Sequence, residues 1–389
     1  MGVLVLKQAN RILSTYTADV SGVCSALYEM GGLTVMHDAS GCNSTYNTHD
    51  EPRWYTMPSR IYISGLTEME AMLGDEEKLL HDLVEGIREL KPRFCAVAGT
   101  PIPAMMGADL PGIARAAERR TGVPCFGFQT TGMQSYVTGA SMAFEAVARR
   151  FSPALPRAEG LSVNLLGVTP LDFSVMGNVE ALRALFAENG IPVRSCWAMG
   201  SSWEELMEAG RASVNLVLSS AGLKLAQFFR EKYGAPYVVG IPMGEALTAR
   251  YLSAVREAAQ TGECRFPAKG AEIPGEGGAL IIGEAVWAAS MRRAYELFTG
   301  KPARVLCPLE LDGETLAPGD LRETGEREIA AAMQGADLVI ADPIYRFVLP
   351  KGTSFLRFPH EGYSGRIWRK EIPVFVGKSW DEWFSQHKF

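Results

Sequence analysis

Short runs of Val, Ile and Leu alternate with longer amphipathic stretches along almost the whole chain. This alternation is typical of βαβ units, in which helices cover both faces of a parallel sheet. It predicts an α/β protein with Rossmann-like, doubly wound domains and mainly parallel sheets. A helix is expected over 75–90, because acidic residues fill its first turn. The expected strands are 33–37, 60–64, 93–99, 123–128, 161–167, 213–219, 236–241, 279–284, 303–307, 337–342 and 372–377.

Two stretches, 152–160 and 262–278, lose this periodicity and gain Pro, Gly and charge. Such a composition is typical of linkers. The stretches divide the chain into three parts that each repeat the alternation. We therefore expect an N-terminal α/β domain over 1–155, a middle α/β domain over 156–265 and a C-terminal α/β domain over 266–389.

Composition and charge restrict the partners of this chain. Of its 389 residues 47% are hydrophobic and 21% charged, which argues against disorder, and a net charge of −6 gives no support for a nucleic-acid or membrane surface. No apolar stretch reaches the roughly 18 residues of a membrane span, and the N-terminus lacks the pattern of a secretory signal. We expect a cytoplasmic protein that, without a phosphate loop or dinucleotide fingerprint, does not itself bind nucleotide.

The seven cysteines fall into groups with different expected roles. An odd number at ordinary density argues against a disulfide framework. Four lie inside apolar strand-like runs, where Cys usually serves as a small buried hydrophobe: Cys95, Cys125, Cys196 and Cys307. Cys24 and Cys42 are instead flanked by Gly and Ser, and Cys24 is expected to open a helix, whose dipole stabilises a thiolate. Two cysteines alone make an incomplete metal site.

The densest polar segment, HDASGCNSTYNTHDEPRW, runs from His37 to Trp54 and follows an expected strand. Ligand sites in open α/β sheets lie beyond the carboxyl ends of strands. His37 and His49 are candidate proton donors and acceptors, since the pKa of His suits that role. The alternative is that the acidic residues cap a loop and that His37 only orients the chain through a backbone hydrogen bond.

The stretch from Cys24 through HDASGC resembles the first two cluster cysteines of the nitrogenase component 1 superfamily. The resemblance continues through four further segments: GLTEMEAMLGDEEKLL (65–80), AGTPIPAMMGADL (98–110), SVNLVLSSAGLKLAQFFREKYGAPYV (213–238) and the units ALIIGEAVWAAS and ADLVIADPIYRF. It implies that Cys24 and Cys42 ligate iron. It also implies that Asn43 and Ser44 donate hydrogen bonds to cluster sulfides.

Departures from the family pattern modify this expectation. Thr100 stands where members with a full set carry the third cluster cysteine, so one chain offers two thiolates. A [4Fe-4S] cluster wants four ligands, which two copies about a two-fold axis would supply. Ser219 occupies the position of the cofactor cysteine, and His360 lies near that of the cofactor histidine. No iron-molybdenum cofactor is therefore expected, and the space between the domains is left for an organic substrate or another cofactor.

The resemblance implies the catalytic component of a nitrogenase-like reductase. Its electrons would come from a partner iron protein, which alone would bind ATP, through an intersubunit [4Fe-4S] cluster. The expected assembly is a homodimer, or a dimer with a related subunit. Two alternatives remain: a scaffold for assembling a metal cluster or cofactor, and a cluster-free binding module in which Cys24 and Cys42 are buried thiols.

Overall fold

The computed structural model describes residues 10–14, 16–41, 51–270, 278–311 and 313–387. In this part of the chain three parallel sheets contain four, four and five strands, which confirms the predicted α/β fold with mainly parallel sheets. The sheets lie within 33–128, 163–239 and 279–357. The exact domain boundaries remain a prediction. No helix in the described ranges is long and apolar enough to span a membrane.

The first sheet has the strand order β2-β1-β3-β4. Strands β1 and β3 are buried at every residue, as expected when helices cover both faces. The amphipathic α3 packs five apolar residues toward one face and confirms the helix predicted over 75–90. The elements of this part are α1 (Asp19–Leu27), β1 (Leu33–His37), β2 (Ile61–Ile63), α2 (Glu68–Leu73), α3 (Glu77–Leu90), β3 (Cys95–Gly99), α4 (Pro101–Met106), α5 (Leu110–Thr121), β4 (Cys125–Phe128) and α6 (Tyr136–Phe151).

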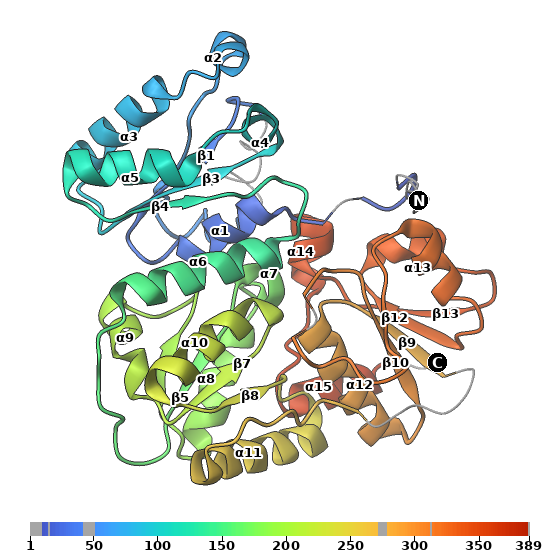
Figure 1. The fold of residues 1–389 in the computed structure, drawn as a ribbon. Helices are drawn as coiled ribbons and strands as arrows, with labels where there is room; N and C mark the ends of the chain where they lie inside the picture. The colour runs from blue at the N-terminus through green and yellow to red at the C-terminus, as the bar shows by residue number, and fades with distance from the viewer. Residues whose placement is uncertain (1–9, 15, 42–50, 271–277, 312, 388–389) are drawn as a thin grey trace, which may run out of the picture.

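The second sheet repeats this arrangement with the order β6-β5-β7-β8. Helices α1 and α6 lie between the first and second sheets (Figure 1). They approach closely because two glycines face the opposite helix: a Cβ on Gly22 would lie 2.0 Å from the carbonyl oxygen of Tyr136. The elements here are β5 (Val163–Leu166), α7 (Pro170–Phe173), α8 (Asn178–Glu188), β6 (Val193–Cys196), α9 (Trp203–Met207), β7 (Val214–Val217), α10 (Leu223–Tyr233), β8 (Tyr237–Val239) and α11 (Gly244–Thr261).

The third sheet has the order β11-β10-β9-β12-β13 and lies beside the other two (Figure 1). One large apolar core reaches from α1 and α6 through the second sheet into the third. The strand predicted over 372–377 is wrong: this segment is extended, but it forms only one bridge, between Met243 and Gly377. The elements are β9 (Ala279–Ile282), α12 (Ala285–Thr299), β10 (Ala303–Cys307), β11 (Leu321–Arg322), α13 (Glu326–Ala332), β12 (Leu338–Ala341), β13 (Ser354–Arg357), α14 (Glu361–Ser364) and α15 (Lys378–Ser385).

Candidate functional site

Each sheet has one switch point, which lies between two neighbouring strands whose following connections run to opposite sides of the sheet. Buried polar residues follow the strands at these points. The switch points lie between β1 and β3, β5 and β7, and β9 and β12. Ligands of open α/β sheets bind beyond the carboxyl ends of such strands. The buried polar residues that follow these strand ends, or close β1, are His37, Asp38, Thr100, Thr169, Asp172, Ser219, Ser220, Glu284 and Asp342. They define the candidate site.

At the switch point of the first sheet the structure brings His37 and Thr100 together. The hydroxyl of Thr100 donates to the backbone oxygen of His37 over 3.1 Å. His37 Nδ1 lies 2.9 Å from Ser64 Oγ, while its Nε2 is buried with no hydrogen-bond partner among the described residues. Burial lowers the pKa of His37, so the ring is neutral near pH 7. The Thr100 hydroxyl therefore forms a hydrogen bond with the backbone, and Nε2 of His37 has no hydrogen-bond partner among the described residues.

Cys24 lies in the middle of α1, not at its start. The prediction that Cys24 opens a helix is wrong, because the helix begins at Asp19, whose carboxylate lies in the first turn. Cys24 is fully buried. Burial raises the pKa of its thiol well above the usual range, and the Glu51 carboxylate raises it further. As it stands in one chain, the thiol is protonated.

The predicted site residues Cys42, Asn43, Ser44 and His49 lie outside the described residues. The position of the predicted second ligand relative to Cys24 is therefore not described. Within the described ranges no group of three or more His, Cys, Asp or Glu side chains is arranged to hold a metal ion. Cys24 supplies the right donor chemistry for iron, provided that its thiol loses the proton. A complete set of ligands would therefore depend on Cys42 and on a second copy.

Cys95 cannot replace the missing third cysteine. It belongs to the apolar cluster under α3 and α5, whereas Cys24 belongs to the large core on the other face of the first sheet. Successive side chains of a strand point to opposite faces, and Ala96 and Ala98 are the β3 residues that share the face of Cys24.

A buried ion pair stands beside Cys24, and sequence reasoning did not find its role. Arg53 Nε lies 2.7 Å from Glu51 Oε1, and Arg53 Nη1 lies 3.0 Å from Glu29 Oε1. Ser25 also donates to Glu51 over 2.8 Å. Nη1 of Arg53 donates to the carbonyl of Ala198 as well, so the pair ties the first sheet to the second.

His360, Asp172 and Tyr136 meet where the three sheets converge. We call this cluster, with Ser219 and Glu284, the junction. The Tyr136 hydroxyl donates to Asp172 Oδ1 over 2.5 Å, and His360 Nε2 lies 3.6 Å from the same oxygen. Ser219 also hydrogen-bonds Asp172, so the structure brings both predicted cofactor positions, Ser219 and His360, to one carboxyl group.

Burial in the junction favours the neutral forms of its titratable side chains. Burial raises the pKa of Asp172 to about 7, and the Glu284 carboxylate contributes in the same direction. Burial also raises the pKa of Glu284, whose carboxylate accepts from Ser220. His360 is neutral, since burial lowers its pKa to about 3 and its Nδ1 accepts a hydrogen bond from the Gly362 N–H over 3.1 Å.

These contacts do not suit an iron-molybdenum cofactor. The Ser219 hydroxyl is fully buried and accepts a hydrogen bond from the backbone N–H of Ala221. Nδ1 of His360 accepts a hydrogen bond from the backbone N–H of Gly362. Sequence reasoning missed Asp172 and Glu284 because partners such as Tyr136 for Asp172 and Ser220 for Glu284 lie far away in the sequence. The only available signal was their place shortly after expected strands.

Comparisons with known proteins agree with this fold. The family model described as "Nitrogenase component 1 type Oxidoreductase" matches residues 20–306. The chain is 26% identical over 240 residues to the nitrogenase iron-molybdenum cofactor biosynthesis protein NifE of Clostridium pasteurianum, covering 57% of this chain and 51% of that protein. It is 32% identical over 149 residues to a subunit of the light-independent protochlorophyllide reductase of Nostoc punctiforme, covering 37% and 28%.

The chain thus spans about half the length of the first of these relatives. Its fold is similar to the solved structure "Nitrogenase Cp1 at pH 6.5", with a TM-score of 0.70 at 17% identity over 99% of this chain and 93% of that one. Because the family model matches well over half of the sequence, the chain belongs to the nitrogenase component 1 type oxidoreductase family.

Proposed function

We propose that this protein is the catalytic component of a nitrogenase-like, ATP-dependent reductase. Electrons would pass from a partner iron protein, through a [4Fe-4S] cluster shared between two copies, to a substrate at the junction. The observation that carries this proposal is that Asp172, which follows β5, interacts electrostatically with Glu284, which follows β9, so the switch points of the second and third sheets meet at one buried carboxyl group. ATP would be bound by the partner alone.

Reduction of an organic substrate consumes a proton with each electron, and the junction supplies groups that can provide it. Asp172 has a pKa of about 7, so it exists in both protonation states near neutral pH. Tyr136 and Ser219 hold its carboxyl group in place through hydrogen bonds. His360 adds a neutral ring 3.6 Å away.

Cys24 and Cys42 are the proposed cluster ligands. Two thiolates from each of two identical copies make the four that a [4Fe-4S] cluster wants. The cluster would carry single electrons, as these clusters do in proteins generally. A dimer with a related subunit is the other assembly that meets the same requirement.

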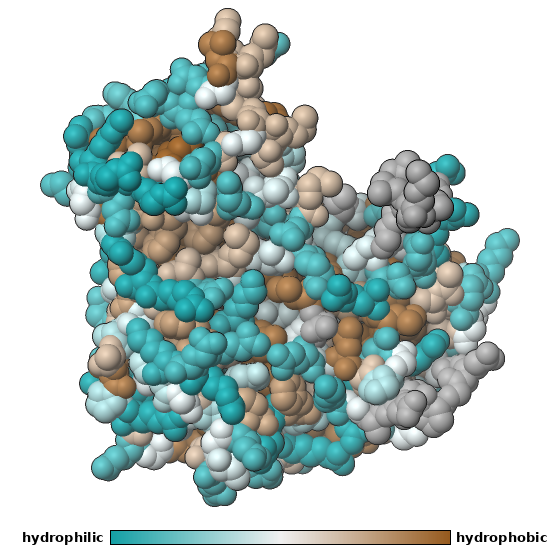
Figure 2. All heavy atoms as spheres, in the orientation of Figure 1, coloured by the Kyte–Doolittle hydropathy of each residue, from teal (hydrophilic) through white to brown (hydrophobic). Residues whose placement is uncertain are grey.

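An exposed apolar surface on the first sheet's helices supports docking of a partner. Helix α2 buries none of its residues, although a capping box at Thr67 and a left-handed Gly74 fix both of its ends. Met72 is 76% exposed, and Met105 of the neighbouring α4 is 87% exposed. Figure 2 shows apolar atoms gathered on the part of the molecule that α2 and α4 occupy in Figure 1. Exposed apolar groups on preformed helices are typical of interaction sites.

The test combines the protein with a nitrogenase-type iron protein, MgATP and dithionite under anaerobic conditions. We expect the iron protein to be oxidised faster than either component alone permits, and only with ATP. The control is Cys24→Ala, which should abolish the acceleration. Reduction at full rate by NADH without a partner would contradict the proposal and indicate a self-contained oxidoreductase.

A scaffold for metal-cluster or cofactor assembly is the second candidate. It is supported by the similarity to NifE, which is named a cofactor biosynthesis protein. Turnover separates the two functions, because a scaffold releases its cluster to an acceptor and reduces nothing catalytically. Iron and sulfide analysis separates both from a cluster-free binding module.

A further inference from the structure

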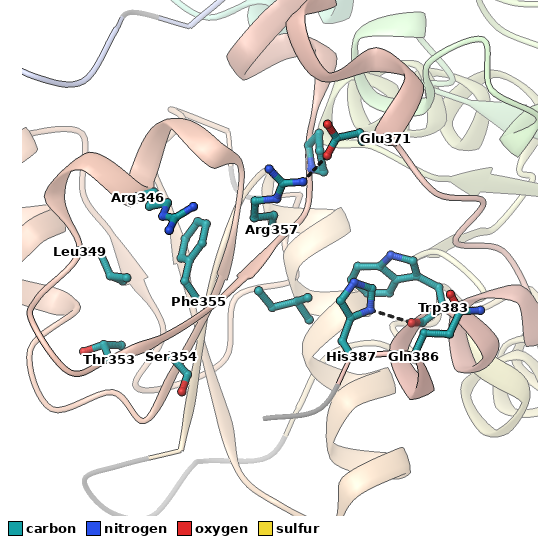
Figure 3. Close-up of a pocket in the computed structure, with 12 residues that line it drawn as sticks. Arg346, Leu349, Thr353, Ser354, Phe355, Arg357, Glu371, Trp383, Gln386 and His387 are labelled. Atoms are coloured by element: carbon teal, nitrogen blue, oxygen red, sulfur yellow. Dashed lines mark hydrogen bonds and ion pairs between the residues drawn. The ribbon is translucent and has the colours of Figure 1, made fainter.

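A groove of about 830 Å³ lies along the outer edge of the third sheet. It is built by β13, by the segment before it and by the end of α15 (Figure 3). All of its lining residues lie beyond residue 306, outside the part that the family model matches. Family membership therefore assigns no role to this groove.

The backbone of β13 presents unused hydrogen-bonding groups to the groove. Among the described strands β13 pairs with β12 alone. The N–H groups of Ser354 and Phe358 donate to Asp337 and Ala341 over 3.1 and 2.8 Å. Since alternate residues of a strand point their N–H and C=O to opposite edges, those of Phe355 and Arg357 face outward.

One side of this edge is cationic. Phe355 and Arg357 share a face of the strand, and Figure 3 shows Arg346 beside Phe355. Arg357 pairs with Glu371 and stacks over the Trp368 ring at 5.2 Å. The guanidinium of Arg346 is exposed and forms no ion pair or side-chain hydrogen bond with any described residue.

The other side of the edge is aromatic. The rings of Phe358 and Trp383 lie 5.1 Å apart, which places the end of α15 on the face of the even-numbered residues. His387 packs against Trp383 with ring centroids 4.9 Å apart, and its Nδ1 lies 2.9 Å from the Trp383 carbonyl oxygen (Figure 3). In a strand that pairs with β13, every second side chain would therefore face the cationic surface, and the side chains between them would face the aromatic surface.

We propose that the β13 edge binds an extended segment of a partner protein by strand addition, with acidic side chains beside Arg346 and apolar side chains against Trp383. Main-chain hydrogen bonds to Phe355 and Arg357 would hold the segment, and the two flanking surfaces would select its alternating side chains. A free small anion would use only the guanidinium groups and leave the strand edge unpaired. This inference goes beyond the proposed reductase function and does not depend on it.

The test uses a fluorescein-labelled, end-capped hexapeptide of alternating Glu and Leu and the full chain. We expect saturable fluorescence anisotropy, together with slowed amide hydrogen exchange at Phe355 and Arg357. Arg346→Glu should weaken binding about tenfold or more, since charge-assisted hydrogen bonds contribute this much. The matched control is Arg327→Glu, because Arg327 is an exposed residue on α13 away from the groove.

Three further probes keep the proposal falsifiable without altering the strand. The same peptide carrying N-methyl groups cannot donate its backbone hydrogens, so it should lose binding. A Lys-Leu peptide that binds as well as the Glu-Leu peptide would overturn the proposal. So would free glutamate that competes at equal concentration, which would indicate a small-anion site, or self-association that Arg346→Glu abolishes, which would identify a second copy as the occupant.

Discussion

Replacing Arg53 by Met tests the buried ion pair beside Cys24. The Arg53 and Glu51 side chains are 3% and 0% exposed, so the pair is screened very little by water. Met fills much of the same volume without a charge. The variant leaves the Glu51 carboxylate buried, with hydrogen bonds from Ser25 and from the backbone N–H of residue 53 but without the guanidinium charge.

The expected cost is large because one partner of a buried pair remains without its counter-charge. Such changes cost about 3–5 kcal/mol of the free energy of unfolding. The matched control is Arg88→Met, since Arg88 pairs with Glu85 over 2.7 Å at 61% and 56% exposure. An exposed pair of this kind contributes about 0–1 kcal/mol.

The loss of unfolding free energy caused by Arg53→Met should depend on pH, because the pKa of Glu51 changes. Burial alone raises the pKa of Glu51, but the Arg53 charge and hydrogen bonds outweigh it and hold that pKa below its usual value. A depressed pKa stabilises the fold above the pKa of the unfolded chain, and this contribution is lost as pH falls through the folded-state pKa. In Arg53→Met the pKa of Glu51 rises, so its carboxyl group takes up a proton at a higher pH than in the unchanged protein. The deficit should therefore be largest near pH 7 and shrink toward pH 4.

The assay is urea unfolding followed by tryptophan fluorescence and circular dichroism at pH 7 and at pH 4.5. We expect Arg53→Met to lower the unfolding free energy several-fold more than Arg88→Met at pH 7. The double variant Glu51→Gln with Arg53→Met should recover part of the loss, since no charge is left behind. Equal effects of Arg53→Met and Arg88→Met, or a deficit that grows as pH falls, would refute the reasoning.

Three further substitutions test other contacts of the structure. Gly22→Ala should lower the melting temperature strongly, because its Cβ would lie 2.0 Å from the Tyr136 carbonyl oxygen, whereas a Cβ on Gly41 would meet no described residue within 4 Å, so Gly41→Ala should change the melting temperature little. Tyr136→Phe removes a hydrogen bond to the Asp172 carboxylate, so the pKa of Asp172 should rise above about 7, measured by infrared titration of the carboxyl band; an unchanged or lower value would be inconsistent with this contact. Cys95→Ala should retain full iron content, since Cys95 faces the opposite side of the first sheet, and loss of iron would show that the cluster ligands are wrongly assigned.

Strand and helix periodicity was sufficient to predict the fold class, because parallel strands buried on both faces are mostly apolar along their length. The prediction at 372–377 failed because IPVFVG, although apolar enough for a strand, does not join a sheet. Its backbone instead forms hydrogen bonds with the Asn178 side chain at the start of α8 and one bridge, from Gly377 to Met243. The start of α1 differs from the prediction because Gly22, a residue type that ordinarily weakens a helix, lies inside it. In the structure that glycine allows α6 to approach.

The candidate site was only partly predictable. His37, Thr100, Ser219 and His360 were found from their places after expected strands and from the family resemblance. Asp172 and Glu284 were not, because a buried carboxyl group with shifted pKa depends on neighbours more than 30 residues away in sequence, such as Tyr136 for Asp172. Single-sequence patterns carry no information on which strand ends meet.

The most direct test of the central claim is native mass spectrometry of the anaerobically purified protein, combined with iron and sulfide analysis. We expect a dimer that holds one [4Fe-4S] cluster per two chains. We also expect that Cys24→Ala and Cys42→Ala each lose the cluster, while Cys95→Ala keeps it. A full complement of iron in either of the first two variants, or one cluster bound to each single chain, would contradict this claim.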